Sequence, residues 1–136
     1  MSNTPALPLY ALTPITLRAS IVIPCFNERQ TVIELIDRIH AVPVDKEVIV
    51  VDDCSTDGTR ELLQKRAREC GDITLRLRQR NGGKGASVQE GLRCASGDVV
   101  IIQDADLEYD PADYPVLLRP IQTGKAHVVY GSRFIG

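Results

Sequence analysis

The sequence predicts a single α/β domain with a mostly parallel sheet that is covered by helices on both faces. Short apolar runs alternate with longer segments of helical periodicity. Several of these runs are apolar at every position, as in strands that are buried on both sides. The length of 136 residues suits one domain with one hydrophobic core.

The first elements can be assigned in chain order. Residues 1–17 lack periodicity and contain several prolines, so we expect a flexible N-terminal arm before a domain over 18–136. ASIVIPCF predicts a buried strand, and NERQTVIELIDRIHAV predicts a helix with Asn27 at its N-cap. KEVIVVDD predicts the next strand. DGTRELLQKRAREC predicts a second helix that Asp57 caps and Gly71 ends.

The second half continues this alternation. DITLRLRQ alternates apolar and polar residues, which indicates a strand near a sheet edge. NGGKGASVQEGLRCASG predicts a glycine-rich turn and a helix, and DVVIIQDAD a further strand. PADYPVLLRPIQTG predicts a short helix limited by Pro115 and Pro120, and AHVVYGSRF a fifth strand. Because no helix follows that strand, we expect either a truncated domain or a missing second half.

Composition and charge disfavour several functional classes. The formal net charge of -2 argues against a protein whose main partner is nucleic acid. The four cysteines are widely spaced without a C-x-x-C pair, so we expect reduced thiols and no zinc site. No apolar run reaches the roughly 18 residues of a membrane span, and no signal peptide is recognisable. These features are typical of a cytoplasmic protein.

Polar side chains follow four of the predicted strands, at the end where ligands of open parallel sheets bind. They are Glu28 after the first strand, where Pro24 and Phe26 also lie, Asp52 and Asp53 after the second, Asp104 and Asp106 after the fourth, and Arg133 after the fifth. The sequence therefore predicts one shared binding edge.

The acidic segment after the fourth predicted strand carries carboxyls at every second position. Asp104 and Asp106 flank Ala105 and can point the same way on an extended backbone. Two such charges about 5 Å apart repel by roughly 3 kcal/mol at an effective dielectric near 20. Hard oxygen ligands with room for substrate phosphates suit Mg²⁺ or Mn²⁺. A solvated acidic loop is the alternative.

The other candidate residues are less specific on their own. Asp52 or Asp53 can accept hydrogen bonds from a nucleobase or ribose, or one of them can cap the following turn. NGGKGAS fits neither a Walker A loop nor the dinucleotide fingerprint, but it leaves Lys84 free to reach a phosphate. Arg133 can bind a phosphate with two donors or be an ordinary surface residue.

Five segments in order, IVIPCFNE, EVIVVDDCSTDGT, NGGKGAS, DVVIIQDADLEYDP and VVYGSRF, resemble the family 2 glycosyltransferases. Within that family they are similar to the polyprenyl-phosphate sugar transferases of the dolichyl-phosphate mannose synthase type. The resemblance covers residues 18–136 and implies a three-layer α/β/α GT-A fold, which is Rossmann-like. It also implies metal-dependent transfer, with inversion, of a sugar from GDP-mannose or a UDP-sugar to an acceptor, above all a polyprenyl phosphate of cell-envelope glycan synthesis.

The resemblance implies a role for each matching residue. Asp104 and Asp106 hold Mg²⁺ or Mn²⁺ against the donor diphosphate, and Glu108 completes the metal shell. The donor site comprises Pro24, Phe26, Glu28, Asp52, Asp53, Lys84 and Ala105 with the two aspartates. Arg133 approaches the donor phosphates or the acceptor phosphate, and we count it with Asp104 and Asp106 as catalytic. Phe26 stands where the family usually has Tyr, which leaves stacking without a hydroxyl group.

The expected partners are a nucleotide-sugar donor and a lipid-phosphate acceptor, with peripheral contact at the cytosolic face of a membrane and no nucleic acid. The acceptor portion of the domain is expected beyond Gly136. One alternative is a domain that binds nucleotide sugars without turnover. Another is a sugar-phosphate nucleotidyltransferase, although PCFNERQTV lacks the glycine-rich loop of that class. A receiver domain is disfavoured because DITLRLRQR ends without a phosphoacceptor Asp.

Overall fold

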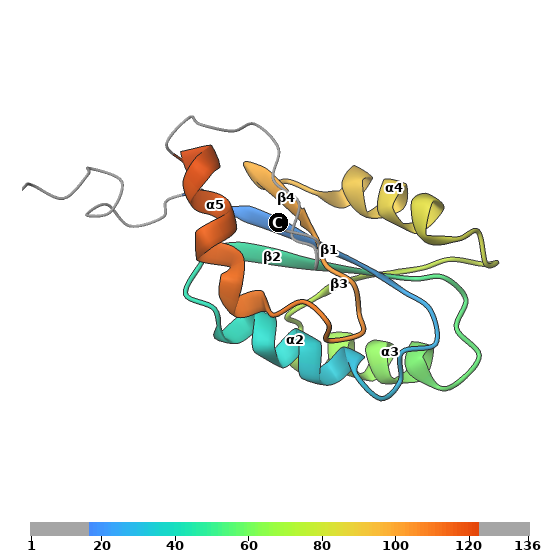
Figure 1. Ribbon diagram of the computed structural model, residues 1–136. Helices are drawn as coiled ribbons and strands as arrows, with labels where there is room; N and C mark the ends of the chain where they lie inside the picture. Colours follow the sequence, from blue (N-terminus) through green and yellow to red (C-terminus); the bar gives the residue numbers. More distant parts are fainter. Residues whose placement is uncertain (1–16, 123–136) are drawn as a thin grey trace, which may run out of the picture.

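The computed structural model describes residues 17–122 of the chain (Figure 1). The predicted N-terminal arm, apart from Leu17, lies outside the described residues. The predicted fifth strand, AHVVYGSRF, and Arg133 also lie outside them. The architecture below is therefore that of the segment from the first predicted strand to the helix after the acidic loop.

Four parallel strands form one sheet in the order β3-β2-β1-β4, which confirms the predicted α/β class. The strands are β1 (Ala19–Cys25), β2 (Lys46–Asp52), β3 (Thr74–Leu77) and β4 (Val99–Ile102). β1 and β2 pair along their whole lengths, and β3 lies at an edge of this sheet, as predicted. The chain order reverses at β1, because β2 lies on one side of it and β4 on the other.

Helices cover both faces of the sheet, so the predicted three layers are present (Figure 1). α2 (Val32–Ala41), α3 (Thr59–Cys70) and α5 (Tyr114–Gln122) lie on one face, and α4 (Lys84–Cys94) lies on the other. The short 3-10 helix η1 (Pro111–Asp113) leads into α5.

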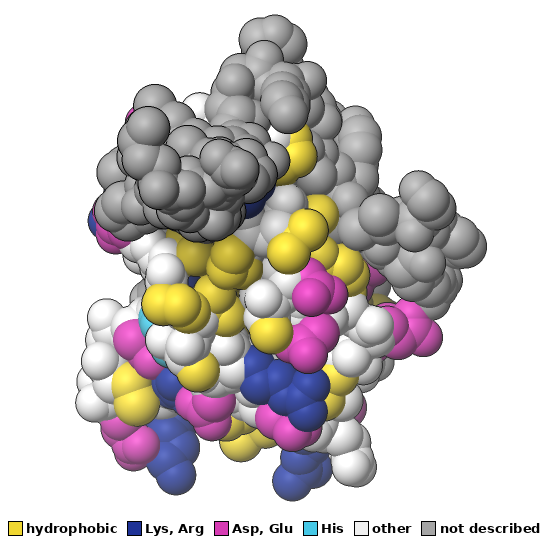
Figure 2. Space-filling view, turned by 60° about the vertical axis from the view of Figure 1, so that its left-hand side comes forward, with side chains coloured by type: hydrophobic (Ala, Val, Ile, Leu, Met, Phe, Trp, Pro, Cys, Tyr) yellow, Lys and Arg dark blue, Asp and Glu magenta, His cyan; other side chains and the backbone are white. Residues whose placement is uncertain are grey.

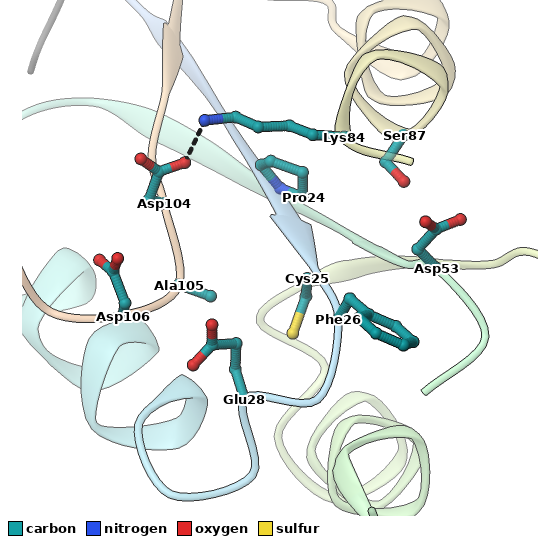
Figure 3. A pocket seen from close by; sticks show the side chains of 10 residues that line it. All are labelled: Pro24, Cys25, Phe26, Glu28, Asp53, Lys84, Ser87, Asp104, Ala105 and Asp106. Carbon is teal, nitrogen blue, oxygen red and sulfur yellow. Dashed lines mark hydrogen bonds and ion pairs between the residues drawn. The ribbon is translucent and has the colours of Figure 1, made fainter. Parts of the chain in front are cut away.

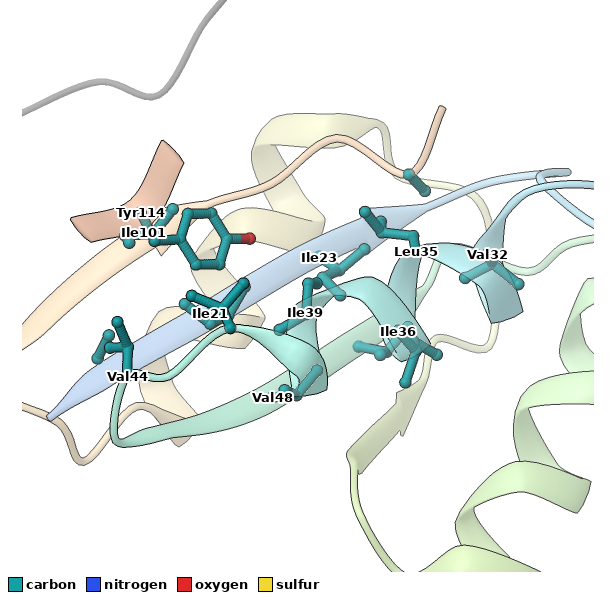
Figure 4. Close-up of a cluster of buried hydrophobic side chains, with 14 of the residues drawn as sticks. Ile21, Ile23, Val32, Leu35, Ile36, Ile39, Val44, Val48, Ile101 and Tyr114 are labelled. Carbon is teal, nitrogen blue, oxygen red and sulfur yellow. The ribbon is translucent and has the colours of Figure 1, made fainter. Parts of the chain in front are cut away.

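The larger hydrophobic core lies between the sheet and α2 (Figure 4). Ile21 and Ile23 of β1 face α2, whereas Val22 faces α4, because successive side chains of a strand point to opposite faces. α2 buries Val32, Leu35, Ile36 and Ile39, which follow the spacing of one helical face. Burying an aliphatic side chain fully contributes about 1.5–3 kcal/mol, so this face holds α2 against the sheet.

The first helix begins later than predicted. It starts at Val32, and Asn27 is not its N-cap. Asn27 instead adopts a left-handed backbone with φ 53°. Its Oδ1 accepts a hydrogen bond from the backbone N–H of Thr56 at 2.8 Å, and its own N–H donates to Ser55 Oγ at 2.9 Å. Asn27 therefore joins the loops after β1 and β2. Its hydrogen bonds go to residues that are distant in sequence and not to the first turn of the helix.

The other predicted helix ends were closer to the structure. Asp57 lies one residue before the N-cap of α3, and its carboxylate accepts the Thr59 N–H at 3.0 Å. Gly71 ends α3 in the left-handed region, with φ 63°, as predicted. Pro120 does not limit α5 but lies inside it, where the burial of Leu118 holds the helix on the core.

Charged side chains of both signs are mixed on the surface. Figure 2 shows hydrophobic side chains in the middle of one face, with Lys and Arg beside Asp and Glu beneath them. This mixture agrees with the small net charge of -2. Across residues 17–122, we find no helix with the length and apolar character that a bilayer span requires.

Candidate functional site

A cavity of about 300 Å³ opens at the carboxyl edge of the sheet, where the strand order reverses (Figure 3). Open parallel sheets bind their ligands at this position. The end of β1 contributes Pro24, Cys25, Phe26 and Glu28, the end of β2 contributes Asp53, α4 contributes Lys84 and Ser87, and the loop after β4 contributes Asp104, Ala105 and Asp106. All of these except Cys25 and Ser87 belong to the predicted donor site.

The β1 end forms an aromatic and apolar wall of the cavity. Phe26 is 46% exposed, which leaves its ring available to a ligand. The Cys25 thiol is buried in the same wall. Burial, together with the nearby Asp52 and Glu28 carboxylates, raises the pKa of Cys25 to about 12. The thiol therefore stays neutral and packs as an apolar group.

Asp53 is a buried carboxylate that holds the glycine-rich turn in place. Its Oδ1 accepts hydrogen bonds from Arg78 Nε at 3.0 Å and from the Gly82 N–H at 2.9 Å. Its Oδ2 accepts the Gly83 N–H at 2.8 Å. A carboxylate offers about four lone-pair sites, so one remains for a ligand. Asp53 thus positions the start of α4 and still lines the cavity.

Asp52 lies outside the cavity lining, although it was predicted beside Asp53. Its side chain is fully buried. It points away from that of Asp53, because neighbouring side chains at a strand end point to opposite faces. Its Oδ2 accepts the Ser55 N–H at 3.1 Å and lies 3.5 Å from Arg60 Nη1. Asp52 therefore has the turn-capping position that the sequence left open for one of the two acids.

Lys84, the first residue of α4, reaches across the mouth of the cavity (Figure 3). Its Nζ donates to Asp104 Oδ1 at 2.5 Å. Gly83, with φ 90°, turns the chain into the helix just before it. The lysine therefore supplies a positive charge at the acidic loop and also lies at a helix N-terminus, where anions are favoured.

The acidic loop exposes both aspartates and buries the residue between them. Asp104 and Asp106 are exposed, whereas Ala105 is buried. The Thr31 hydroxyl donates to the Ala105 carbonyl at 2.5 Å, which ties the loop to the start of α2. Asp106 Oδ1 accepts the backbone N–H of Glu108 at 3.1 Å. Both carboxylates line the cavity with an oxygen-rich edge.

The two aspartates fit a divalent ion that is shared with a phosphate ligand. Mg²⁺ and Mn²⁺ commonly bind through one or two carboxylates plus substrate phosphate oxygens. Within residues 17–122, no cluster of three or more His, Cys, Asp or Glu is arranged to hold a metal. Glu108 is exposed and does not line the cavity, so the structure does not bring the predicted third ligand to the pair.

Besides Cys25, two residues near the cavity escaped the sequence prediction. The Ser87 hydroxyl is buried without a hydrogen-bond partner among the described residues. It follows Lys84 by one helical turn, and that spacing is the signal that could have identified it. Thr31 meets Ala105 across 74 residues of sequence, so no local signal could have identified it. Arg133 lies outside the described residues.

Residues 20–136 match the sequence profile of Glycosyl transferase family 2, and the chain belongs to this family. It is 35% identical over 121 residues to the dolichol-phosphate mannosyltransferase of Pyrococcus furiosus, which covers 88% of this chain and 34% of that protein. It is 36% identical over 124 residues to the dodecaprenyl-phosphate galacturonate synthase of Rhizobium johnstonii. That alignment covers 87% of this chain and 36% of that protein. The chain therefore spans about a third of the length of these relatives.

Solved structures share the fold. A mannosyltransferase of Pyrobaculum calidifontis in complex with GDP-Man and Mn²⁺ superposes with a TM-score of 0.64 at 28% identity, over 83% of this chain and 36% of that one. A glucosyl-3-phosphoglycerate synthase of Mycobacterium tuberculosis was solved with Mn²⁺, UDP and glucosyl-3-phosphoglycerate. It superposes with a TM-score of 0.63 at 33% identity, over 79% of this chain and 40% of that one. The predicted GT-A fold is confirmed, and a divalent metal accompanies the nucleotide in both neighbours.

Proposed function

We propose that this chain binds a nucleotide-diphosphate sugar in the cavity of Figure 3 and acts as a metal-dependent glycosyltransferase. The main support is that one cavity combines two kinds of surface. An exposed aromatic ring, Phe26, lies on the side of a buried carboxylate, Asp53. Lys84 and the exposed Asp104 and Asp106 lie on the other side. The first surface suits a nucleoside, and the second suits a diphosphate with a dication.

On the nucleoside side, the Phe26 ring would stack on the base, and Pro24 and Cys25 would supply apolar wall. Asp53 would accept a hydrogen bond from a base N–H or a ribose hydroxyl through its remaining lone pair. Glu28, which lines the same cavity near Ala105, is a second acceptor. In this proposal Asp52 acts from behind the wall by holding the turn after β2. Guanine and uracil both offer N–H donors, so the proposal includes GDP- and UDP-sugars.

On the diphosphate side, Lys84 and the first N–H groups of α4 would contact the phosphates. Asp104 and Asp106 would hold Mg²⁺ or Mn²⁺, and Glu108 remains a candidate ligand that would have to turn toward them. The dication would neutralise the negative charge of the leaving nucleoside diphosphate. Mn²⁺ has the support of the two structural neighbours, and Mg²⁺ has the support of the ligand chemistry.

We propose a polyprenyl phosphate as the acceptor, since the named relatives act on dolichol phosphate and dodecaprenyl phosphate. A phosphate is anionic at neutral pH, so it can attack the anomeric carbon without a general base, and attack from the opposite face inverts the configuration. The part of the cavity lining that the structure describes contains no histidine, which fits this chemistry. Arg133 would contact a phosphate, and a lipid acceptor would place the protein at the cytosolic face of a membrane.

Calorimetric titration with GDP-mannose and UDP-glucose, with and without Mn²⁺ or Mg²⁺, tests the proposal. Metal-dependent binding of one donor, followed by transfer to a short polyprenyl phosphate, is the expected result. Binding without transfer would favour a nucleotide-sugar-binding domain, an alternative supported by the chain spanning about a third of its relatives. The absence of binding to either donor under all conditions would overturn the proposal.

A further inference from the structure

Gln103 is a buried amide directly before the acidic loop. The sequence places it at the end of an otherwise apolar run, and its side chain is only 1% exposed. Its backbone N–H donates to the Val22 carbonyl at 2.9 Å, which extends the pairing of β4 with β1 by one residue. Burying an amide is costly unless its polar atoms are hydrogen-bonded, so its partners show what the side chain does.

The Gln103 amide bridges the two ends of the acidic loop. Its Nε2 donates to the carbonyl oxygens of Asp104 and Tyr109, both at 3.1 Å. Its Oε1 accepts the hydroxyl of Tyr114, which is fully buried, at 2.7 Å. Carbonyl oxygens can only accept hydrogen bonds, so the nitrogen must face the loop and the oxygen must face the tyrosine.

These contacts determine where the loop can lie. Between Asp104 and Tyr109 the chain has no helix or strand, and Leu107 adopts the left-handed region with φ 65°. The Thr31 hydroxyl holds the loop at Ala105 from the side of α2. Gln103 holds both ends of the loop from the core, and Tyr114 at the start of α5 holds Gln103. The exposed aspartates therefore lie on a loop whose position is set by hydrogen bonds to the buried Gln103, which in turn is bonded to the buried Tyr114.

We propose that Gln103 is a positioning residue, held by Tyr114, that presents the carboxylates of Asp104 and Asp106 to a dication and its nucleoside diphosphate. The proposal rests on the proposed function. Residues that orient metal ligands typically change metal affinity by about 10–100-fold when they are replaced. A role confined to core stability would instead change metal affinity only as far as it unfolds the protein.

Three variants of the full chain separate these roles. Gln103→Met keeps the length of the side chain but removes its three hydrogen bonds. Tyr114→Phe removes only the hydroxyl and keeps the two bonds to the loop. The double variant removes the unpaired tyrosine hydroxyl that the single Met variant leaves buried, so it should melt at a higher temperature than Gln103→Met. Ile36→Val, a core change on α2 that removes none of these hydrogen bonds, is the control for lost stability.

Mn²⁺ affinity is measured in the presence of saturating UDP or GDP, and nucleotide affinity is measured again in EDTA. Gln103→Met and the double variant should bind Mn²⁺ about tenfold more weakly, while metal-free nucleotide affinity changes less than about twofold. Tyr114→Phe should show a smaller loss, and Ile36→Val none. The decisive observation is a double variant that recovers stability without recovering Mn²⁺ affinity. Recovery of both together, or unchanged Mn²⁺ affinity in Gln103→Met, would overturn the proposal.

Amide hydrogen exchange of the metal-free protein provides an independent readout. Exchange at residues 104–109 should accelerate in Gln103→Met and in the double variant, with the strands unaffected. Equal exchange of the loop in wild type and both variants would contradict the positioning role. If the wild-type chain shows no Mn²⁺-dependent nucleotide binding, the proposed function fails, and the exchange rates still decide whether Gln103 holds the loop.

Discussion

Lys84 Nζ lies 2.5 Å from Asp104 Oδ1, so the first residue of α4 pairs with the first carboxylate of the acidic loop. The two side chains are 61% and 54% exposed. Exposed ion pairs of this kind contribute only about 0–1 kcal/mol. The lysine therefore reduces repulsion within the acidic loop. Because the ion pair is weak, Asp104 can leave it to bind a metal ion, and Lys84 can leave it to bind a phosphate, with little loss of free energy.

Lys84→Met should change two affinities in opposite directions. Mn²⁺ alone should bind the variant a few-fold more tightly, because no ammonium competes for Asp104. Nucleoside diphosphate with Mn²⁺ should bind about tenfold more weakly, a loss of about 1.4 kcal/mol, because the phosphates lose a cation. Calorimetry measures both values, and Lys65→Met, at an exposed lysine of α3, is the control. If both affinities rose or both fell, Lys84 would not be exchanging Asp104 for a phosphate.

Asp106→Asn should abolish metal-dependent donor binding without lowering the melting temperature. The amide oxygen can still accept the Glu108 N–H that Asp106 Oδ1 accepts at 3.1 Å, so the turn is preserved. Removing one charge also relieves repulsion in the loop. Asp113→Asn, the same change at an exposed residue outside the cavity, should leave donor binding intact. A large loss of stability with donor affinity retained would show that Asp106 serves the turn alone.

Stability should depend on pH through the ion pair of Arg66 and Asp72. Arg66 Nε and Nη2 donate to the two Asp72 oxygens at 3.0 and 2.7 Å. These hydrogen bonds lower the pKa of Asp72 below its ordinary value of 3.8. A lowered carboxyl pKa stabilises the fold above that ordinary value, and the stabilisation is lost as the pH falls through the folded pKa.

Arg66→Met should therefore lower the free energy of unfolding by about 1–2 kcal/mol at neutral pH. The difference from wild type should shrink as the pH falls below 3.8. Arg38→Met removes an exposed ion pair with Glu34 one helical turn away, and it should cost at most about 0.5 kcal/mol. Urea unfolding across pH measures both variants. A deficit that is the same at every pH would assign the effect to packing of the arginine stem.

Gly91→Ala should destabilise the protein because α4 packs closely on β1 at this position. A Cβ added at Gly91 would overlap Cγ1 of Val22, which is fully buried and cannot move away. Overpacking costs about 1–3 kcal/mol, which outweighs the gain of up to about 1 kcal/mol in helix propensity. Gly85→Ala in the same helix meets open space and should be neutral or stabilising in thermal unfolding. Equal effects of the two changes would refute the close approach.

Local pattern predicted the elements well where burial alone decides them. The apolar runs of β1 and β2 predicted strands of a sheet that is covered on both faces. The apolar residues from Val32 to Ile39 lie on one side of a helix, so that side was predicted to face the sheet. The helix ends were less predictable. Asn27 has the side chain of an N-cap, but the Thr56 N–H competes for it across 29 residues of sequence.

The candidate site, too, was predictable in part. Parallel strands align their carboxyl ends, so the polar ends of β1, β2 and β4 had to meet on one edge. Alternation along the chain separates the two acids after β2, but only the packed structure shows that Asp53 lines the cavity and that Asp52 is buried outside its lining. Gln103 was not singled out from the sequence, and its partner Tyr114 is not predictable from the apolar run that Gln103 ends.

The sequence by itself determined the order of strands and helices and the edge at which the polar residues gather, because apolar segments must be buried and side chains alternate along a strand. Only the tertiary structure decided the partner of each polar group. Lys84 with Asp104, Thr31 with Ala105 and Gln103 with Tyr114 are such pairs. A hydrogen bond depends on distance and angle in space, and residues far apart in the chain acquire these only when the core packs.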